Sequence, residues 1–243
     1  MNLNISFTNL QANNFLKVLL VIDLSFAFLY GILHILASDW PLGQIHNLFN
    51  LDGETTLPAW FSSMQLFLAG IFLFAIGRMQ SKDSKLPSSF FYFLSVLFVF
   101  LSADEGAAIH EKISALARRL ELSWMLFNGK NGAWIMVYGL IGMIILGFIF
   151  PYFRIAWKYH PTASKLAVLS GFIFLTGAVG FELLSYFYLR DGANPLFYKL
   201  EVMFEEFFEM SGISIFIRAL LFIKQTSPYK QQNHLSKLEN KLV

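Results

Sequence analysis

Residues 131–157, NGAWIMVYGLIGMIILGFIFPYFRIAW, decide the fold class of this chain. The stretch carries no charged side chain before Arg154. It is longer than the roughly 20 apolar residues that take a helix across the hydrocarbon core of a bilayer. In lipid, a spanning segment satisfies its backbone hydrogen bonds only as a helix or within a closed barrel. An uninterrupted apolar run of this length therefore predicts a transmembrane helix.

Five further segments have the same character. They are Phe15–Ala37, Pro58–Met79, Ser88–Lys112, Ser164–Leu189 and Phe197–Ile223. Turn-forming residues such as Pro41, Pro87 and Pro161 lie between them. The sequence thus predicts an all-α fold, a polytopic membrane helix bundle of about six transmembrane helices. We divide it into an N-terminal cytoplasmic segment (1–14), a six-helix transmembrane domain (15–224) and a polar C-terminal tail (225–243).

The composition agrees with a membrane protein and narrows the chemistry. The chain is 56% hydrophobic and only 14% charged, whereas soluble domains carry about 25% charged residues. It contains no cysteine, which excludes disulfides, iron–sulfur clusters and thiolate zinc sites. A net charge of +2 gives no reason to expect a nucleic-acid partner. The expected partners are membrane lipids, with a second copy of the chain or another membrane protein as further candidates.

The segment from Ile113 to Phe127 differs from the spans. Its apolar residues recur at helical spacing, but Arg118, Arg119 and Glu121 interrupt them. This pattern is typical of an amphipathic helix that lies on the membrane surface. We predict one such interfacial helix between the third and fourth spans.

Basic residues predict the orientation of the bundle. Placing both termini in the cytoplasm puts most of the 18 Lys and Arg residues on the inner side, among them Arg78, Lys82, Arg154 and Lys158. The 38–57 loop, which has no Lys or Arg, then lies outside. Residues 1–14 lack the basic start of a signal peptide, so we expect the first apolar segment to stay in the membrane.

Acidic residues inside the predicted spans are the main functional signal. A charged side chain at the centre of a spanning helix costs about 2.5–3.5 kcal/mol on insertion scales, and such residues are functional candidates. The ionisable residues in or at the ends of the spans are Asp23, His34, Asp104, Glu105, His110, Glu111, Glu182, Glu201, Glu205, Glu206 and Glu209. Apart from Asp23, all of them fall at the same outer depth when the direction of each helix is followed.

Helical spacing sorts these residues by face. Asp104 and Glu111 point nearly the same way, and Glu201, Glu205 and Glu209 form a stripe on the last helix. In contrast, Glu206 and Glu105 diverge from the two stripes, and we expect them to pair with basic residues. On the first helix, Asp23, Tyr30 and His34 share one face and extend polarity inward.

Carboxylates and imidazoles from several helices are the ligand set of membrane and bundle metal sites. We predict a metal ligand pool of Asp104, His110, Glu111, Glu182, Glu205, Glu209 and His34, with Glu105 and Glu201 as catalytic candidates. The ion would be divalent zinc, iron or manganese. The Glu-x-x-His pairs of di-iron proteins are absent, since Glu105 and His110 are too far apart in sequence. The favoured activity is a metal-dependent hydrolase or oxidoreductase acting on a lipid or a membrane-surface substrate.

Two other functions fit the same residues. A proton or divalent-cation transporter would use the carboxylates as a vestibule and continue inward along a proton path of Asp23, Tyr30 and His34. A non-catalytic subunit would use the acidic patch to dock a basic partner. The plain structural interpretation is that glutamates near helix ends sit at the wet interface.

Several motifs resemble those of a known group of proteins. Leu51-Asp52-Gly53-Glu54 with Pro58-Ala59-Trp60, the Ser-x-Asp-Glu…His-Glu motif of Ser102–Glu111, Gly180-Phe181-Glu182, and Glu205–Met210 are similar to those of a group of bacterial multipass inner-membrane proteins. The resemblance covers about Asp52 to Arg218. It implies a bacterial inner-membrane location and that these acidic motifs belong together, and it carries over no activity.

Overall fold

The structure is a computed structural model that describes residues 8–36, 43–80, 84–122, 132–189 and 194–226. Everything regular in these ranges is helical. The elements are α1 (Asn9–Tyr30), η1 (Gly31–Leu36), α2 (Gly43–Leu48), α3 (Leu57–Met79), α4 (Ser88–Ala107), α5 (Ile109–Arg119), α6 (Ala133–Tyr159), α7 (Pro161–Leu175), η3 (Thr176–Phe181), α8 (Glu182–Leu184), η4 (Ser185–Leu189) and α9 (Pro195–Thr226). The η segments are π-helical turns. The predicted all-α bundle is confirmed.

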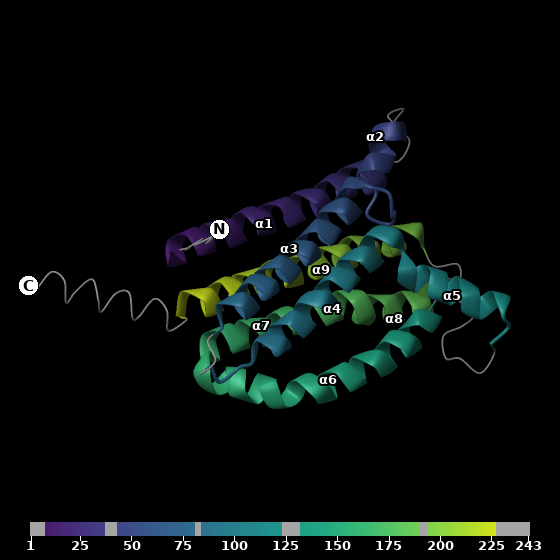
Figure 1. The fold of residues 1–243 in the computed structure, drawn as a ribbon. Coiled ribbons are helices and arrows are strands. Elements are labelled where there is room, and N and C mark those ends of the chain that lie inside the picture. Colours follow the sequence, from purple (N-terminus) through teal and green to yellow (C-terminus); the bar gives the residue numbers. More distant parts are fainter. Residues whose placement is uncertain (1–7, 37–42, 81–83, 123–131, 190–193, 227–243) are drawn as a thin grey trace, which may run out of the picture.

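Five of these helical stretches are long and apolar enough to cross a membrane. They are Asn9–His34, Leu57–Met79, Ser88–Ala107, Ala133–Tyr159 and Pro161–Leu189. The sixth predicted span corresponds to α9, which has 32 residues and reaches roughly 48 Å at a rise of 1.5 Å per residue. Its glutamates make it less apolar than the others. Since α9 packs between α1, α3 and α7 (Figure 1), it lies inside the bundle of a multipass membrane protein.

Local signals explain where the helices start. Thr8 caps α1, because its hydroxyl accepts a hydrogen bond from the Gln11 backbone N–H and the Gln11 side chain reaches back to Thr8. Thr56 caps α3 ahead of Pro58 in the first turn. Pro161 similarly occupies the first turn of α7. These positions agree with the breakers that separate the spans in the sequence.

The third and fifth predicted spans are not continuous α-helices. The segment Ser88–Lys112 breaks after α4 because Ala108 adopts a left-handed conformation, with φ at 49°. The segment Ser164–Leu189 changes to π-helical turns from Thr176 onward. Such wider turns often accompany functional sites because they redirect side chains. Both irregularities fall where the acidic residues lie.

Close approach of α9 to α7 and η3 is made possible by glycines. A Cβ atom at Gly212 would stand 2.8 Å from the Phe174 backbone nitrogen, and one at Gly177 would stand 2.7 Å from the Glu205 carbonyl oxygen. Small residues at helix contacts let backbones approach in membranes. The apolar core beside this contact contains Leu73, Ile217 and Leu221.

The start of α1 and the end of α9 lie at the same end of the bundle, and α2 and α5 lie at the other end (Figure 1). A hydrogen bond of 2.8 Å from Arg218 Nε to Asn13 Oδ1 ties the two helices together there. The start of α1 and the end of α9 thus lie on one side of the bundle. That this side is the cytoplasm remains a prediction.

The amphipathic helix predicted at 113–127 corresponds to α5. It begins earlier than expected, at Ile109, and residues 123–131 lie outside the described part of the chain. Ser114 and Ala117 are buried on its inner face, while Leu116 and Leu120 are exposed. The Ser114 hydroxyl accepts a hydrogen bond from the Trp134 backbone, which fixes α5 to the start of α6.

Candidate functional site: an acidic chamber

A cavity of about 190 Å³ lies at the end of the bundle where α9 begins. Ten of the 16 Asp and Glu residues of the chain line it. They are Asp52, Glu54, Asp104, Glu105, Glu111, Glu182, Glu201, Glu205, Glu206 and Glu209. His110 also lines the cavity, and no Lys or Arg of the described residues does. We call this cavity the acidic chamber.

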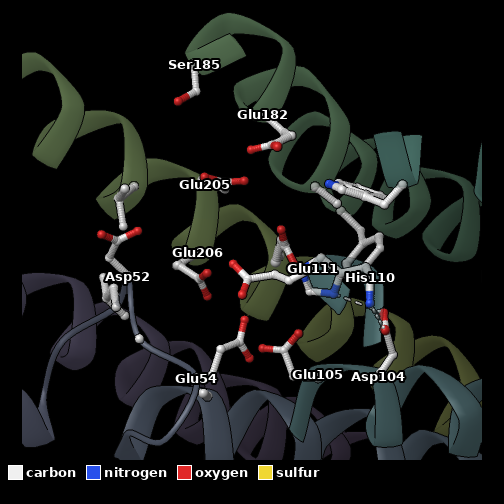
Figure 2. Close-up of a pocket in the computed structure, with 18 of the residues that line it drawn as sticks. Asp52, Glu54, Asp104, Glu105, His110, Glu111, Glu182, Ser185, Glu205 and Glu206 are labelled. Carbon is white, nitrogen blue, oxygen red and sulfur yellow. Dashed lines mark hydrogen bonds and ion pairs between the residues drawn. The ribbon is translucent and has the colours of Figure 1, made fainter. Parts of the chain in front are cut away.

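The chamber is built by segments far apart in sequence. The loop before α3 contributes Asp52 and Glu54, and α8 contributes Glu182 (Figure 2). The segment around the α4–α5 break contributes Asp104, Glu105, His110 and Glu111. The first half of α9 supplies the remaining carboxyls. The convergence of the third, fifth and sixth predicted spans is therefore observed.

Asp104 organises one wall of the chamber. Its Oδ1 accepts hydrogen bonds from the His110 backbone N–H at 2.8 Å and from the Tyr138 hydroxyl at 3.0 Å. Its Oδ2 lies 3.4 Å from His110 Nδ1. The left-handed Ala108 makes this possible, since it turns the chain back so that Asp104 caps the first turn of α5. Non-glycine residues in this conformation are uncommon and mark over-determined local structure.

The charge state of His110 follows from these contacts. Burial disfavours the imidazolium, but the hydrogen bond and negative charge of Asp104 outweigh it and raise the pKa of His110 above its ordinary value. The charged form therefore stabilises the folded protein below the unfolded pKa of about 6.5. That contribution is lost as the pH rises through the higher folded pKa.

Asp104→Asn is accordingly expected to lower the pKa of His110, because the neutral amide no longer favours the imidazolium. NMR titration of protein carrying isotope-labelled histidine, in detergent with a chelator present, measures the shift. His160, whose pKa is lowered by burial at the other end of α6, is the internal control. An unchanged His110 midpoint would contradict the assigned role of Asp104.

The middle of the chamber gathers carboxyls that repel one another. Glu206 interacts electrostatically with Glu209, Glu105 and Glu54. Figure 2 shows Glu54 and Glu105 side by side with Glu206 opposite. Burial raises the pKa of Glu54, and the charges of Glu111 and Asp104 raise it further against the opposite effect of His110. Like charges at this density must be offset by protons or by bound cations.

The expectation that Glu105 and Glu206 pair with basic residues is wrong. Both line the chamber, Glu105 from the end of α4 and Glu206 from the first half of α9. Arg118 and Arg119 are exposed on α5. Lys199 instead donates a hydrogen bond of 2.6 Å to the His34 carbonyl oxygen.

The residues of the predicted proton path are divided between two places. His34 does not line the chamber; its ring stacks on Tyr30, with centroids 4.4 Å apart, and lies 3.7 Å from the ring of His46. Asp23 lies elsewhere and accepts hydrogen bonds from Gln65 and Ser214. His34 is thus separate from the other six members of the predicted metal pool, all of which line the chamber together with the catalytic candidates Glu105 and Glu201.

The chamber is not a closed coordination shell. Within the described residues, no three His, Asp or Glu side chains stand in an arrangement ready to hold a metal ion. The carboxyls are instead distributed around the wall (Figure 2), as mutual repulsion favours.

Several chamber residues were not predicted as site residues. The Tyr198 hydroxyl donates to Asp52 Oδ1 at 2.9 Å, and Trp134, Tyr138 and Ser185 add to the wall. Asp52 and Glu54 lie in a loop, where carboxylates ordinarily face water, so the search for acidic residues within the predicted spans did not include them. Their presence in the Leu51–Glu54 motif was the available signal.

A family model described as a domain of unknown function, DUF8692, matches residues 15–223. The chain belongs to this family. The DUF8692 match includes every carboxyl of the chamber, from Asp52 to Glu209. No curated protein and no solved structure matches the chain. The DUF8692 assignment is consistent with membership of an uncharacterised group, and it carries no activity.

Proposed function

We propose that this membrane protein binds a divalent metal ion in the acidic chamber and uses it in a reaction on a membrane substrate. The observation that carries the proposal is the lining itself: ten carboxyls and one imidazole, without Lys or Arg among the described lining residues. Hard and borderline divalent cations prefer these oxygen and nitrogen ligands. Zinc, iron and manganese are the candidate ions.

A second feature also favours a ligand in the chamber. Ser185 lines it, is 1% exposed, and its Oγ has no hydrogen-bond partner within the described part of the chain. A buried hydroxyl without a partner is costly. A ligand or its water shell would supply that partner.

The walls suit an amphipathic substrate. Trp134 and Tyr138 of α6 and Phe174 of α7 add aromatic surface to the chamber wall beside the carboxyls. α6 packs loosely against the rest of the protein, since only 6% of its most apolar stretch is buried. No atom lies within 4 Å of the positions that a Cβ would take at Gly139, Gly142 and Gly147. A lipid could therefore enter the chamber past α6. A chamber carboxylate such as Glu105 or Glu201 would act as general base. The proposed reaction class is hydrolysis or oxidation at the membrane surface.

Metal binding tests the proposal directly. The full chain, purified gently in detergent, is expected to retain metal and, after chelation, to bind added Zn²⁺ or Mn²⁺ stoichiometrically by calorimetry. Thermal unfolding should shift upward with metal concentration, as expected for a ligand of the native state. Sub-stoichiometric metal together with no binding of zinc, iron or manganese would overturn the proposal.

A transporter remains the second candidate, because the buried Asp23 network lies inward of the chamber. Cation flux into vesicles that contain the protein would favour it. An absence of flux over a range of ions and potentials would argue against a transporter and favour the metal-dependent enzyme.

A further inference from the structure

Asp23 is a buried carboxyl that the chamber does not use. It lies in the middle of the first span, is 0% exposed, and contacts α3 and α9. Its Oδ1 accepts a hydrogen bond from Gln65 Nε2 at 2.9 Å, and its Oδ2 accepts one from the Ser214 hydroxyl at 2.7 Å. Gln65 Nε2 also donates to Ser214 Oγ at 3.0 Å. The three side chains thus close a ring of hydrogen bonds away from water.

No cation balances Asp23 among the described residues. On α9, Arg218 lies one turn beyond Ser214, but its Nε donates to Asn13, and Glu209 lies toward the chamber. On α1, Lys17 is exposed, and on α3 the first basic residue after Gln65 is Arg78, which is also exposed. A carboxylate at membrane depth is expensive without a counter-charge. A mobile positive charge would remove that cost.

The geometry favours a proton over a metal ion. Gln65 presents N–H donors to Asp23, whereas a metal ion requires oxygen lone pairs. Gln65 Oε1 is buried and has no hydrogen-bond partner in the described ranges. Turning the amide over would bring Oε1 to Asp23, where it could accept the O–H of a carboxylic acid. The ring therefore offers a hydrogen-bonding arrangement for each protonation state of Asp23.

Polar residues continue from this ring toward the chamber. Ser62 lies one turn before Gln65 on α3 and is buried, and its hydroxyl lies near the chamber residue Glu105 but has no hydrogen-bond partner among the described residues. On the opposite side, α1 and α9 pack through apolar residues such as Leu19 and Ile217 before the Arg218–Asn13 pair. The chamber is thus the nearest group of titratable residues along the α3 face, and Leu19 and Ile217 separate Asp23 from the Arg218–Asn13 pair.

We propose that Asp23 is a buried proton-binding site that exchanges its proton with the acidic chamber along the Ser62–Gln65 face of α3. Uptake of one proton at Oδ1 takes the carboxylate from a charge of −1 to neutral, and Gln65 turns from donor to acceptor. The site does not require the chamber to hold a metal.

Infrared difference spectroscopy of the full chain in lipid nanodiscs, with a chelator present, tests this inference. Lowering the pH should produce carbonyl bands of protonated carboxylic acids in the chamber and at Asp23, and Asp23→Asn should remove one component of this signal. Gln65→Leu should shift its frequency, because the amide partner is lost. Glu121→Gln, an exposed acid outside the chamber, should leave it unchanged.

A carbonyl signal that neither Asp23→Asn nor Gln65→Leu changes would overturn the inference. If Asp23→Asn fails to fold, Ser214→Ala replaces it, and an unchanged midpoint for the pH dependence of the band would count against Asp23. Glu105→Gln should slow the appearance of the band after a pH jump, and an unaltered rate would overturn the route from the chamber. Because metal is absent throughout, failure of metal binding leaves this test unaffected.

Discussion

Replacing Glu206 and Glu209 together with glutamine is expected to weaken Zn²⁺ or Mn²⁺ binding by about 100-fold, which corresponds to about 2.8 kcal/mol. Both carboxyls line the chamber and repel each other. The same change should raise the free energy of unfolding of the metal-free protein by an amount on the order of 1 kcal/mol, because it removes like charges that are close together. The thermal midpoint of the metal-free protein should rise accordingly. Calorimetry and thermal unfolding with and without chelator measure the two effects.

These opposite signs distinguish a ligand site from a structural cluster. Sites arranged for ligand binding commonly cost stability when empty. Glu121→Gln is the matched control, since this acid is exposed and does not line the chamber. If the double variant destabilises the metal-free protein, the carboxyls serve the fold, and the metal proposal loses its physical basis.

Alanine at both Gly177 and Gly212 is expected to destabilise the bundle by about 2–6 kcal/mol, taking about 1–3 kcal/mol for each overpacked position. The Cβ atoms would meet the Glu205 carbonyl oxygen at 2.7 Å and the Phe174 backbone at 2.8 Å. Backbone atoms cannot move aside as a flexible side chain can, so α7 and η3 must separate from α9. Unfolding in detergent, followed by tryptophan fluorescence, measures the loss.

Gly171→Ala provides the control on the same helix, because no atom lies within 4 Å of its Cβ position. It should be neutral or slightly stabilising, as alanine is the better helix former. Separation of the helices should also displace Glu205 and Glu209 and weaken cation binding. Stability of the double variant equal to that of Gly171→Ala would show that the helices do not pack as described.

The sequence by itself determined the architecture and much of the chamber. Apolar runs long enough to span a bilayer predict helices because lipid offers no other partner for backbone groups. Helix direction then places the acids of three spans at one depth. Asp104, His110, Glu182 and Glu205 were found in this way, and they line one cavity.

Only the tertiary structure decided which side chains face each other. Helical periodicity assumes an unbroken helix, and the left-handed Ala108 and the π-turns after Leu175 change the facing of every residue beyond them. Glu206 and Glu105 lie on regular helices and still face the chamber, because helix packing decides which faces meet there, and the loop residue Glu54 joins them. Asp23 pairs with Gln65 and Ser214 from helices distant in sequence. Such contacts depend on how helices pack, which a one-dimensional pattern does not encode.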